Sequence, residues 1–278
     1  MINYTLNCNG KLLDLSQCRV MGIVNLSKDS FYTESIATNL DRLHAKVGAM
    51  ISEGVDIVDV GAASSRPGSI PLSAEEEWTI LEPVLNSLRG KYADLLISVD
   101  TYHGSVAERC FDFKVNMIND ISGFQENEEL LDVLSNKSMA YVLMHKKGNT
   151  VNMQDNPTYD NVCLEVLSYF KNKVYKLKKK GILDVVIDPG FGFGKSQVHN
   201  YELLRNMELF KLLDLPILTG VSRKSMIYKS LNITADQSLN GTTGLHMLAL
   251  LNGAKILRVH DVKEAKECIK LHHLYMNA

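Results

Sequence analysis

Residues 184–196 read Asp-Val-Val-Ile-Asp-Pro-Gly-Phe-Gly-Phe-Gly-Lys-Ser, an apolar run that stops at a carboxylate and opens into alternating glycines. The run has the length of a buried strand, and the glycines allow the backbone after Asp188 to approach a ligand closely. A phosphate-binding P-loop is excluded because Pro189, which has no N–H, stands where the motif needs its first glycine. We therefore predict that Asp188 ends a strand at a binding site and that the glycines make room beside the ligand. Lys195 is expected to reach solvent, and we expect Lys195 and Ser196 to contribute little to function.

Seven other short apolar runs end in a polar residue or a glycine in the same way. The eight runs lie at 20–25, 56–61, 96–101, 116–121, 140–145, 184–189, 216–221 and 256–261. Segments with helical periodicity alternate with these runs. Asn39 is expected to cap one helix, Ser73 opens a capping-box sequence ahead of a second that Pro83 should kink, and a third ends in lysines before Gly181. Eight strands alternating with helices over about 250 residues predict an α/β fold of the (β/α)8 TIM-barrel type, with a doubly wound open sheet as the alternative.

The residues ahead of the first run place two short alternating segments around Asn9-Gly10, the dipeptide most typical of a tight hairpin. We predict a short N-terminal β-hairpin that covers one end of the fold. The chain has no linker-like or low-complexity segment, so residues 1–278 are expected to form a single domain.

Composition narrows the class of protein. The net charge of −2 and the pI near 6.4 argue against a dedicated nucleic-acid binder, which would need a basic face. The five cysteines are scattered and never stand in Cys-x-x-Cys spacing, which favours reduced thiols in a cytoplasmic protein over disulfides or a zinc site. Because the N-terminus lacks a basic segment followed by an apolar run, and no stretch could span a bilayer, we expect no membrane partner.

The carboxyl ends of barrel strands meet at one face, where the chemistry of such folds collects. One group of polar residues at these ends suits a flat heterocycle with adjacent N–H and NH2 donors, since a carboxylate accepts two parallel hydrogen bonds. This group consists of Asp100, Asn119 and Asp188, with Lys224 as a cation beside them. Phe193 or Met144 would pack on the face of the ring.

A second group at the strand ends suits an anion with several oxygens. It consists of Arg66, Arg258 and His260, joined by Ser65 and Asn25. Each residue taken singly also has an ordinary structural use: an Asp as a helix cap, Asn119-Asp120 as a turn, Arg258 as a surface ion pair. We interpret Asp59 as a residue of this ordinary structural kind, which precedes a glycine turn and has no part in the site.

Eight motifs in order along the chain resemble the dihydropteroate synthase family of pterin-binding TIM barrels. They are Met21-Gly-Ile-Val-Asn25, Asp29-Ser-Phe31, Ser65-Arg-Pro-Gly68, Ser98-Val-Asp-Thr101, Ile118-Asn-Asp-Ile-Ser-Gly123, Asp188-Pro-Gly190, Ser222-Arg-Lys-Ser225 and Ile256-Leu-Arg-Val-His-Asp-Val262. The resemblance implies a (β/α)8 enzyme, a homodimer, that uses Mg²⁺. It would condense 6-hydroxymethyl-7,8-dihydropterin diphosphate with p-aminobenzoate to dihydropteroate and diphosphate, the folate-pathway step that sulfonamides block.

The resemblance also assigns residues to three subsites. The pterin pocket would consist of Asp100, Asn119, Met144, Asp188, Phe193, Gly220 and Lys224. The diphosphate site would consist of Asn25, Ser65, Arg66, Arg258 and His260, with Mg²⁺ near Asn25. The p-aminobenzoate site would consist of Phe31, Arg66, Pro67 and Ser225.

The first loop departs from the family pattern, because Thr33 stands where an acidic residue is thought to stabilise a cationic intermediate. We hypothesise that Glu34 or Asp29 takes this role, beside Arg66, Arg258, His260 and Lys224 as the other catalytic groups. The altered loop motivates one alternative, a catalytically altered pterin-binding protein. A folate-dependent methyltransferase on the same barrel is a second, although it has no need of the Ser-Arg-Lys-Ser and Arg-Val-His motifs. A (β/α)8 phosphate binder that takes no pterin is a third.

Overall fold

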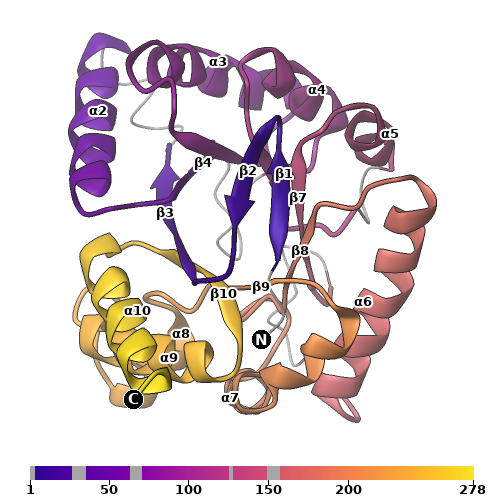
Figure 1. The fold of residues 1–278 in the computed structure, drawn as a ribbon, viewed down its shortest axis with the longest axis vertical. Helices are drawn as coiled ribbons and strands as arrows, with labels where there is room; N and C mark the ends of the chain where they lie inside the picture. Colours follow the sequence, from indigo (N-terminus) through magenta and orange to yellow (C-terminus); the bar gives the residue numbers. More distant parts are fainter. Residues whose placement is uncertain (1–3, 27–35, 63–70, 125–127, 149–156) are drawn as a thin grey trace.

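The computed structural model describes residues 4–26, 36–62, 71–124, 128–148 and 157–278. Eight parallel strands close into a barrel in the order β10-β3-β4-β5-β6-β7-β8-β9 (Figure 1). They are β3 (Arg19–Asn25), β4 (Ile57–Gly61), β5 (Leu96–Asp100), β6 (Met117–Asp120), β7 (Ala140–Met144), β8 (Val185–Asp188), β9 (Ile217–Thr219) and β10 (Ala254–Val259). All eight predicted strands are confirmed. The open-sheet alternative is wrong, because β10 pairs with both β3 and β9.

Helices surround the barrel (Figure 1). They are α2 (Ile36–Ser52), α3 (Ala74–Lys91), α4 (Gly104–Asp112), α5 (Glu129–Asn136), α6 (Val162–Lys179), α7 (Gln197–Arg205), the 3-10 helix η1 (Met207–Leu213), α8 (Ser225–Leu231), α9 (Leu239–Leu251) and α10 (Val262–Met276). The capping box of Ser73 with Glu76 is confirmed. The prediction for Asn39 is wrong by one turn, since α2 begins at Ile36. Pro83 does not interrupt α3, which is one element.

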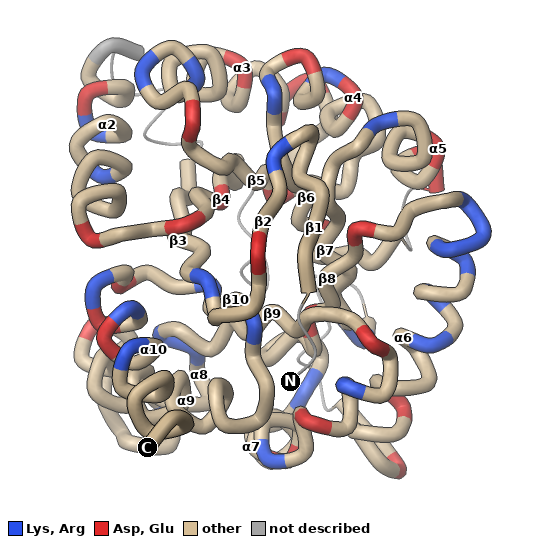
Figure 2. The backbone as a smooth tube through the Cα atoms, in the orientation of Figure 1, with Lys and Arg blue, Asp and Glu red and all other residues tan. Residues whose placement is uncertain are grey.

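The cationic end of α6 is exposed, as the sequence indicates. Asn161 caps the start of this helix by accepting a hydrogen bond from the Leu164 N–H at 3.0 Å. Lys176, Lys178 and Lys179 lie in its last turn and are exposed, and the chain then turns at Gly181 with a φ of 76°. Figure 2 shows several cationic segments, coloured blue, along α6. Cations in this position complement the partial negative charge of the helix end. Within the described ranges, no helix is long and apolar enough to cross a membrane.

The predicted hairpin is confirmed and lies across the amino-terminal end of the barrel (Figure 1). It joins β1 (Thr5–Cys8) to β2 (Lys11–Asp14) through Asn9 and Gly10, whose φ angles of 54° and 81° are both positive, as a type I′ turn requires. The Asn7 N–H donates to Asp184 Oδ1 at 2.7 Å, just before β8. Leu6, Cys8 and Leu13 belong to the same apolar cluster as inward residues of the barrel strands. The hairpin therefore closes one end of the barrel and leaves the other for chemistry.

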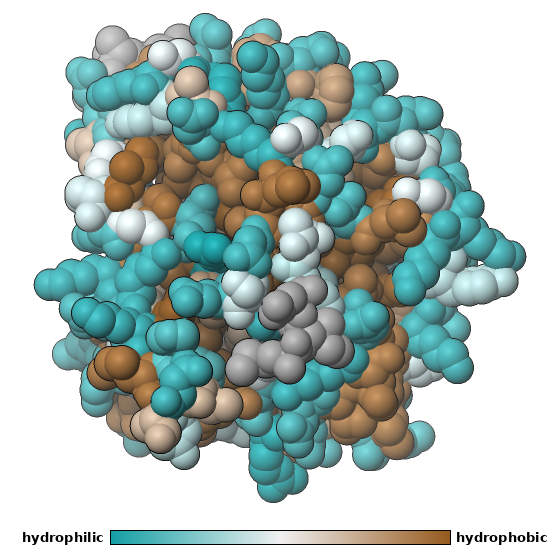
Figure 3. Space-filling view, in the orientation of Figure 1, coloured by the Kyte–Doolittle hydropathy of each residue, from teal (hydrophilic) through white to brown (hydrophobic). Residues whose placement is uncertain are grey.

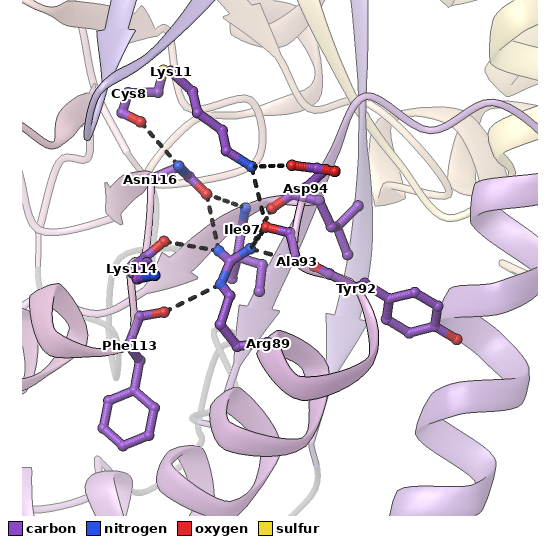
Figure 4. A network of polar contacts seen from close by, with 11 residues as sticks. Cys8, Lys11, Arg89, Tyr92, Ala93, Asp94, Ile97, Phe113, Lys114 and Asn116 are labelled. Carbon is purple, nitrogen blue, oxygen red and sulfur yellow. Dashed lines mark hydrogen bonds and ion pairs between the residues drawn. The ribbon is translucent and has the colours of Figure 1, made fainter.

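Arg89 on α3 fastens the loops at this closed end (Figure 4). Its guanidinium donates to the carbonyl oxygens of Leu95 at 2.7 Å, Lys114 at 2.8 Å and Phe113 at 3.2 Å. It also donates to Asn116 Oδ1 at 3.1 Å, and Asn116 Nδ2 donates in turn to Cys8 O in the hairpin at 2.9 Å. One side chain thus connects α3, the starts of β5 and β6, and the hairpin.

Candidate active site

An arginine and two carboxylates meet inside the barrel near the carboxyl ends of its strands. Arg258 on β10 donates from Nε to Asp59 Oδ2 at 2.7 Å and from Nη2 to Asp100 Oδ2 at 3.2 Å. Asn119 on β6 donates to the same Asp59 oxygen at 3.0 Å. The side chain of Arg258 is 17% exposed and that of Asp59 is 0% exposed. These residues are distant in sequence, and the closed barrel brings them together.

Two structural interpretations of the sequence are wrong at this point. Asp59 is not a turn residue, because β4 continues in ladder pairing with β3 and β5 as far as Gly61. Arg258 is not a surface ion pair, because both of its carboxylate partners lie inside the barrel. Asp59 is the site residue that the sequence reading missed. The sequence did contain a signal, because Asp59 is an acidic residue inside an apolar run. A buried strand tolerates such a residue only when a cation or a hydrogen-bond donor pairs with it.

Asp100 has an unusual protonation equilibrium. Burial raises the pKa of Asp100 to about 7, and the charges of Asp59 and Asp120 act in the same direction, while Arg258 opposes the shift. The carboxyl is therefore balanced between its acid and its ionised form near neutral pH. Carboxyl groups with pKa values displaced toward neutrality gather at functional sites.

Lys224 and the loop after β8 form the second part of the cluster. The Lys224 ammonium donates to Phe191 O and lies 4.7 Å from the centroid of the Phe193 ring. Burial lowers the pKa of Lys224 to about 8; Arg258 adds to this effect, and Asp188 opposes it. Burial raises the pKa of Asp188, whose Oδ1 accepts a hydrogen bond from the Gly190 N–H at 2.7 Å.

Gly220 and Met144 complete this region. A β-carbon at Gly220 would lie 3.9 Å from both Arg258 Cβ and Lys224 Nζ, so Gly220 lies close to both side chains. Met144 is buried at the end of β7, and its Cγ would be 3.2 Å from a β-carbon at Gly190. The structure thus brings together all the residues of the predicted pterin pocket. Their binding roles stay predictions.

The rim of this region carries His260 and Ser222. The Ser222 hydroxyl lies 3.0 Å from His260 Nδ1 and accepts from the His260 N–H at 3.2 Å. Although His260 is exposed at the rim, partial desolvation lowers its pKa, and the charges of Arg258 and Arg223 lower it further. The imidazole is therefore neutral at neutral pH. Arg223 itself donates to both oxygens of Asp261, at 2.9 and 2.6 Å.

Asn25 ends β3 at the same face of the barrel and is exposed. The described residues contain no group of three or more His, Cys, Asp or Glu side chains able to hold a metal ion. Mg²⁺ is commonly held by one or two protein oxygens together with the phosphates of a substrate. The exposed amide of Asn25 fits that limited role.

Several predicted site residues lie outside the described part of the chain. They are Asp29, Phe31, Glu34, Ser65, Arg66 and Pro67. Ser225, the other predicted p-aminobenzoate residue, is the first residue of α8 and follows Lys224 directly.

Lys195 and the glycines before it do not behave as predicted. Lys195 is 2% exposed, and its ammonium donates to Gly190 O at 2.9 Å and to Phe193 O at 3.1 Å. Two of the glycines make room for neighbouring protein backbone. A β-carbon at Gly190 would meet His145 O at 1.9 Å, and one at Gly194 would meet Lys147 O at 2.1 Å. The β8 loop therefore lies directly on the loop after β7, a contact with no signature in the local sequence.

A cavity of about 280 Å³ lies at the opposite end of the barrel. Its lining is mainly apolar and includes Tyr4, Ile217 and Ala254, the last two at the starts of β9 and β10. It shares no residue with the charged cluster. The candidate chemistry belongs to the carboxyl ends of the strands, where the titratable groups converge.

Comparisons with known proteins identify the family of the chain. A family model described as pterin binding enzyme matches residues 21–260. Dihydropteroate synthase of Escherichia coli K12 is 38% identical over 264 residues, which are 94% of this chain and 93% of the relative. The Yersinia pestis dihydropteroate synthase solved with a sulfonamide drug is 35% identical with a TM-score of 0.92, and the match covers 99% of this chain and 100% of that one. The Xanthomonas albilineans dihydropteroate synthase in complex with 7,8-dihydropteroate is 31% identical with a TM-score of 0.86 over 99% of both chains. The chain belongs to the dihydropteroate synthase family of pterin-binding enzymes.

Proposed function

We propose that the protein condenses 6-hydroxymethyl-7,8-dihydropterin diphosphate with p-aminobenzoate, giving dihydropteroate and diphosphate. One observation carries the proposal above the others. Hydrogen-bonding groups (Asn119, Asp188 and Lys224) lie beside the Arg258 side chain at the same end of the barrel. A ligand with a hydrogen-bonding ring and a diphosphate would occupy both parts.

The pterin would be held by its polar edge. The Asp188 carboxylate would accept two parallel hydrogen bonds from adjacent N–H and NH2 donors of the ring, with Asn119 and Asp100 on the far side. The Phe193 ring and the buried Met144 thioether would contact its faces. Lys224, already within reach of Asp188 electrostatically, would donate to a ring acceptor.

Departure of the diphosphate develops negative charge that the protein would stabilise in place. Arg258, the neutral His260 and the Ser222 hydroxyl would contact the leaving oxygens, with Arg66 and Ser65 as the predicted partners from the second loop. We propose that Asn25 holds Mg²⁺, which would neutralise part of the charge on the diphosphate. The methylene left behind is a cation conjugated to the pterin, so the aryl amine attacks without a strong general base. Asp29 or Glu34 would stabilise that cation.

The proposal is tested by incubating the purified protein with both substrates and Mg²⁺. Release of diphosphate that depends on p-aminobenzoate, with dihydropteroate as the product, is the expected result. Pterin binding without release would identify a catalytically altered pterin-binding protein. Sulfonamides should compete with p-aminobenzoate, in line with the drug complex of the Yersinia pestis relative.

The methyltransferase alternative is less well supported. A methyltransferase would use the Asp and Asn residues that bind the pterin, but its substrate carries no diphosphate. Arg258 and His260 would then have no ligand to bind. Transfer of a methyl group from methyltetrahydrofolate, without diphosphate release, would favour it. Because the chain belongs to the family of pterin-binding enzymes, the interpretation as a (β/α)8 phosphate binder that takes no pterin is wrong.

We also propose that the protein is a homodimer in the cytoplasm. Large apolar side chains are exposed on α9 and α10, two helices that pack on each other, and some brown surface shows among the teal at the lower left of Figure 3. They are Leu248, Leu251, Leu271, Leu274, Tyr275 and Met276. Light scattering should give twice the chain mass of 31.1 kDa, falling to the single mass in a Leu248→Glu/Leu274→Glu variant. The location rests on the five cysteines, all of which are free.

A further inference from the structure

Lys195 has no place in the proposed contacts to pterin or diphosphate, yet it is almost wholly buried. Four acceptors surround its ammonium: Gly190 O at 2.9 Å, His145 Nδ1 at 2.9 Å, Phe193 O at 3.1 Å and His145 O at 3.3 Å. None of them is a carboxylate. A lysine is rarely buried without partners, and here backbone carbonyls and one imidazole replace its water.

The acceptors come from two loops that end neighbouring strands. His145 follows β7, and burial together with the charge of Lys195 lowers its pKa to about 2, so its ring is neutral and Nδ1 can accept a hydrogen bond. Gly190 and Phe193 belong to the loop after β8. The positive φ of 67° at Gly190 and 63° at Gly194, and the lack of side chains there, allow the two loops to touch.

The two residues that Lys195 holds in the β8 loop are the ones that would shape the pterin pocket. The Gly190 N–H donates to Asp188 Oδ1 at 2.7 Å while the carbonyl of the same residue accepts from Lys195. The Phe193 carbonyl accepts from Lys195 while its ring faces the Lys224 ammonium. The backbone behind both Asp188 and Phe193 is therefore fixed by one buried group.

We infer that Lys195 is a positioning residue for the pterin substrate, holding the β8 loop against His145 so that Asp188 and Phe193 are presented in a binding geometry. The inference rests on the proposed function. It predicts a selective defect: substitution of Lys195 weakens binding of the pterin substrate and leaves p-aminobenzoate affinity and turnover at saturation largely unchanged. A residue that merely stabilised the fold would not separate the two substrates.

The test compares Lys195→Met, which keeps an unbranched chain of similar length, with Lys195→Gln, whose amide offers two donors. Binding of 6-hydroxymethyl-7,8-dihydropterin diphosphate is titrated without p-aminobenzoate, and steady-state constants are measured for both substrates. We expect the pterin Kd to rise at least tenfold in Lys195→Met and to recover in part in Lys195→Gln. KM for p-aminobenzoate and kcat should change less than threefold.

The control is Lys147→Met on the neighbouring loop. The Lys147 ammonium donates to Thr158 O at 2.6 Å and pairs with Glu165 at 3.1 Å, and the Lys147 side chain is 44% exposed. Its pterin Kd should stay within twofold of the wild type. If Lys195→Met does not fold, Lys195→Gln decides, and it should still raise the Kd at least threefold. A Kd within twofold of the wild type in either folded variant, or equal losses for both substrates, overturns the inference. A wild-type protein that binds the pterin but releases no diphosphate would reject the proposed function alone.

Discussion

Replacing Asp59 with Asn tests whether the buried ion pair organises the site. The change keeps the shape of the side chain but removes the charge that faces Arg258 Nε at 2.7 Å. Asp59 Oδ1 has no hydrogen-bond partner in the described part of the chain, so the new NH2 group placed there would be a buried donor without an acceptor. Removing one partner of a buried ion pair costs roughly 3–5 kcal/mol. Arg258 retains Asp100 at 3.2 Å, which places the expected loss at the lower end, about 3 kcal/mol.

Thermal unfolding and urea denaturation at pH 7.5 measure this loss. For a chain of this size about 3 kcal/mol corresponds to a fall in Tm of roughly 6–12 °C. The pterin substrate should also bind more weakly, because the acceptor that Asn119 and Arg258 share loses its negative charge.

Asp236→Asn is the matched control. This aspartate pairs with Arg223 at 3.3 Å on a side chain that is 93% exposed, so its loss should cost no more than about 0.5 kcal/mol. If Asp59→Asn unfolds within 2 °C of the wild type, the claim that this ion pair organises the barrel interior is refuted.

Three further changes probe other parts of the molecule. Asp188→Asn replaces an acceptor of two charge-assisted hydrogen bonds, each worth roughly 1.5–3 kcal/mol. The pterin Kd should therefore rise on the order of 100-fold in a fluorescence titration, and a rise below fivefold would show that Asp188 does not have that role. Arg89→Met removes the donors to the carbonyls of Leu95, Lys114 and Phe113, and should lower the free energy of unfolding by about 3 kcal/mol without changing kcat. Arg89→Lys should recover less than half of this stability, since an ammonium cannot span those acceptors. The Lys224 amine, with its pKa lowered to about 8, is charged below that pH and neutral above it, so kcat/KM for the pterin substrate should fall as pH rises through 8. A Lys224→Met variant should lack that fall, and a wild-type profile level to pH 9.5 would contradict the assignment.

The strands and the ends of the helices were predictable because local sequence specifies them. An apolar run that stops at a polar residue indicates a buried strand, Asn9-Gly10 indicates a type I′ hairpin, and Ser73 with Glu76 indicates a helix start. Strand ends share one face of a barrel, so Asp100, Asn119 and Asp188 could be grouped without any knowledge of distances.

The contacts that the sequence did not reveal are long-range. Asp59 meets Arg258 across 199 residues, and nothing next to either residue names the other. Lys195 is buried because the loop after β7 lies against its own loop, and this depends on how two neighbouring strands are closed into a barrel. Local patterns specify elements, whereas the partners of a buried charge are set by packing.

The hairpin at the closed end has a consequence for the order of events during synthesis. Its backbone is completed by bonds to residues made much later, and the partner of the Asn7 N–H lies 177 residues further along the chain. At the usual rate of about 5–20 residues per second, Asn7 is added to the chain roughly 9–35 s before Asp184 exists to receive it. The hairpin therefore docks only after the chain has been made as far as Asp184. From the time it emerges from the ribosome until Asp184 is available, its apolar residues Leu6, Cys8 and Leu13 are open to chaperones and proteases.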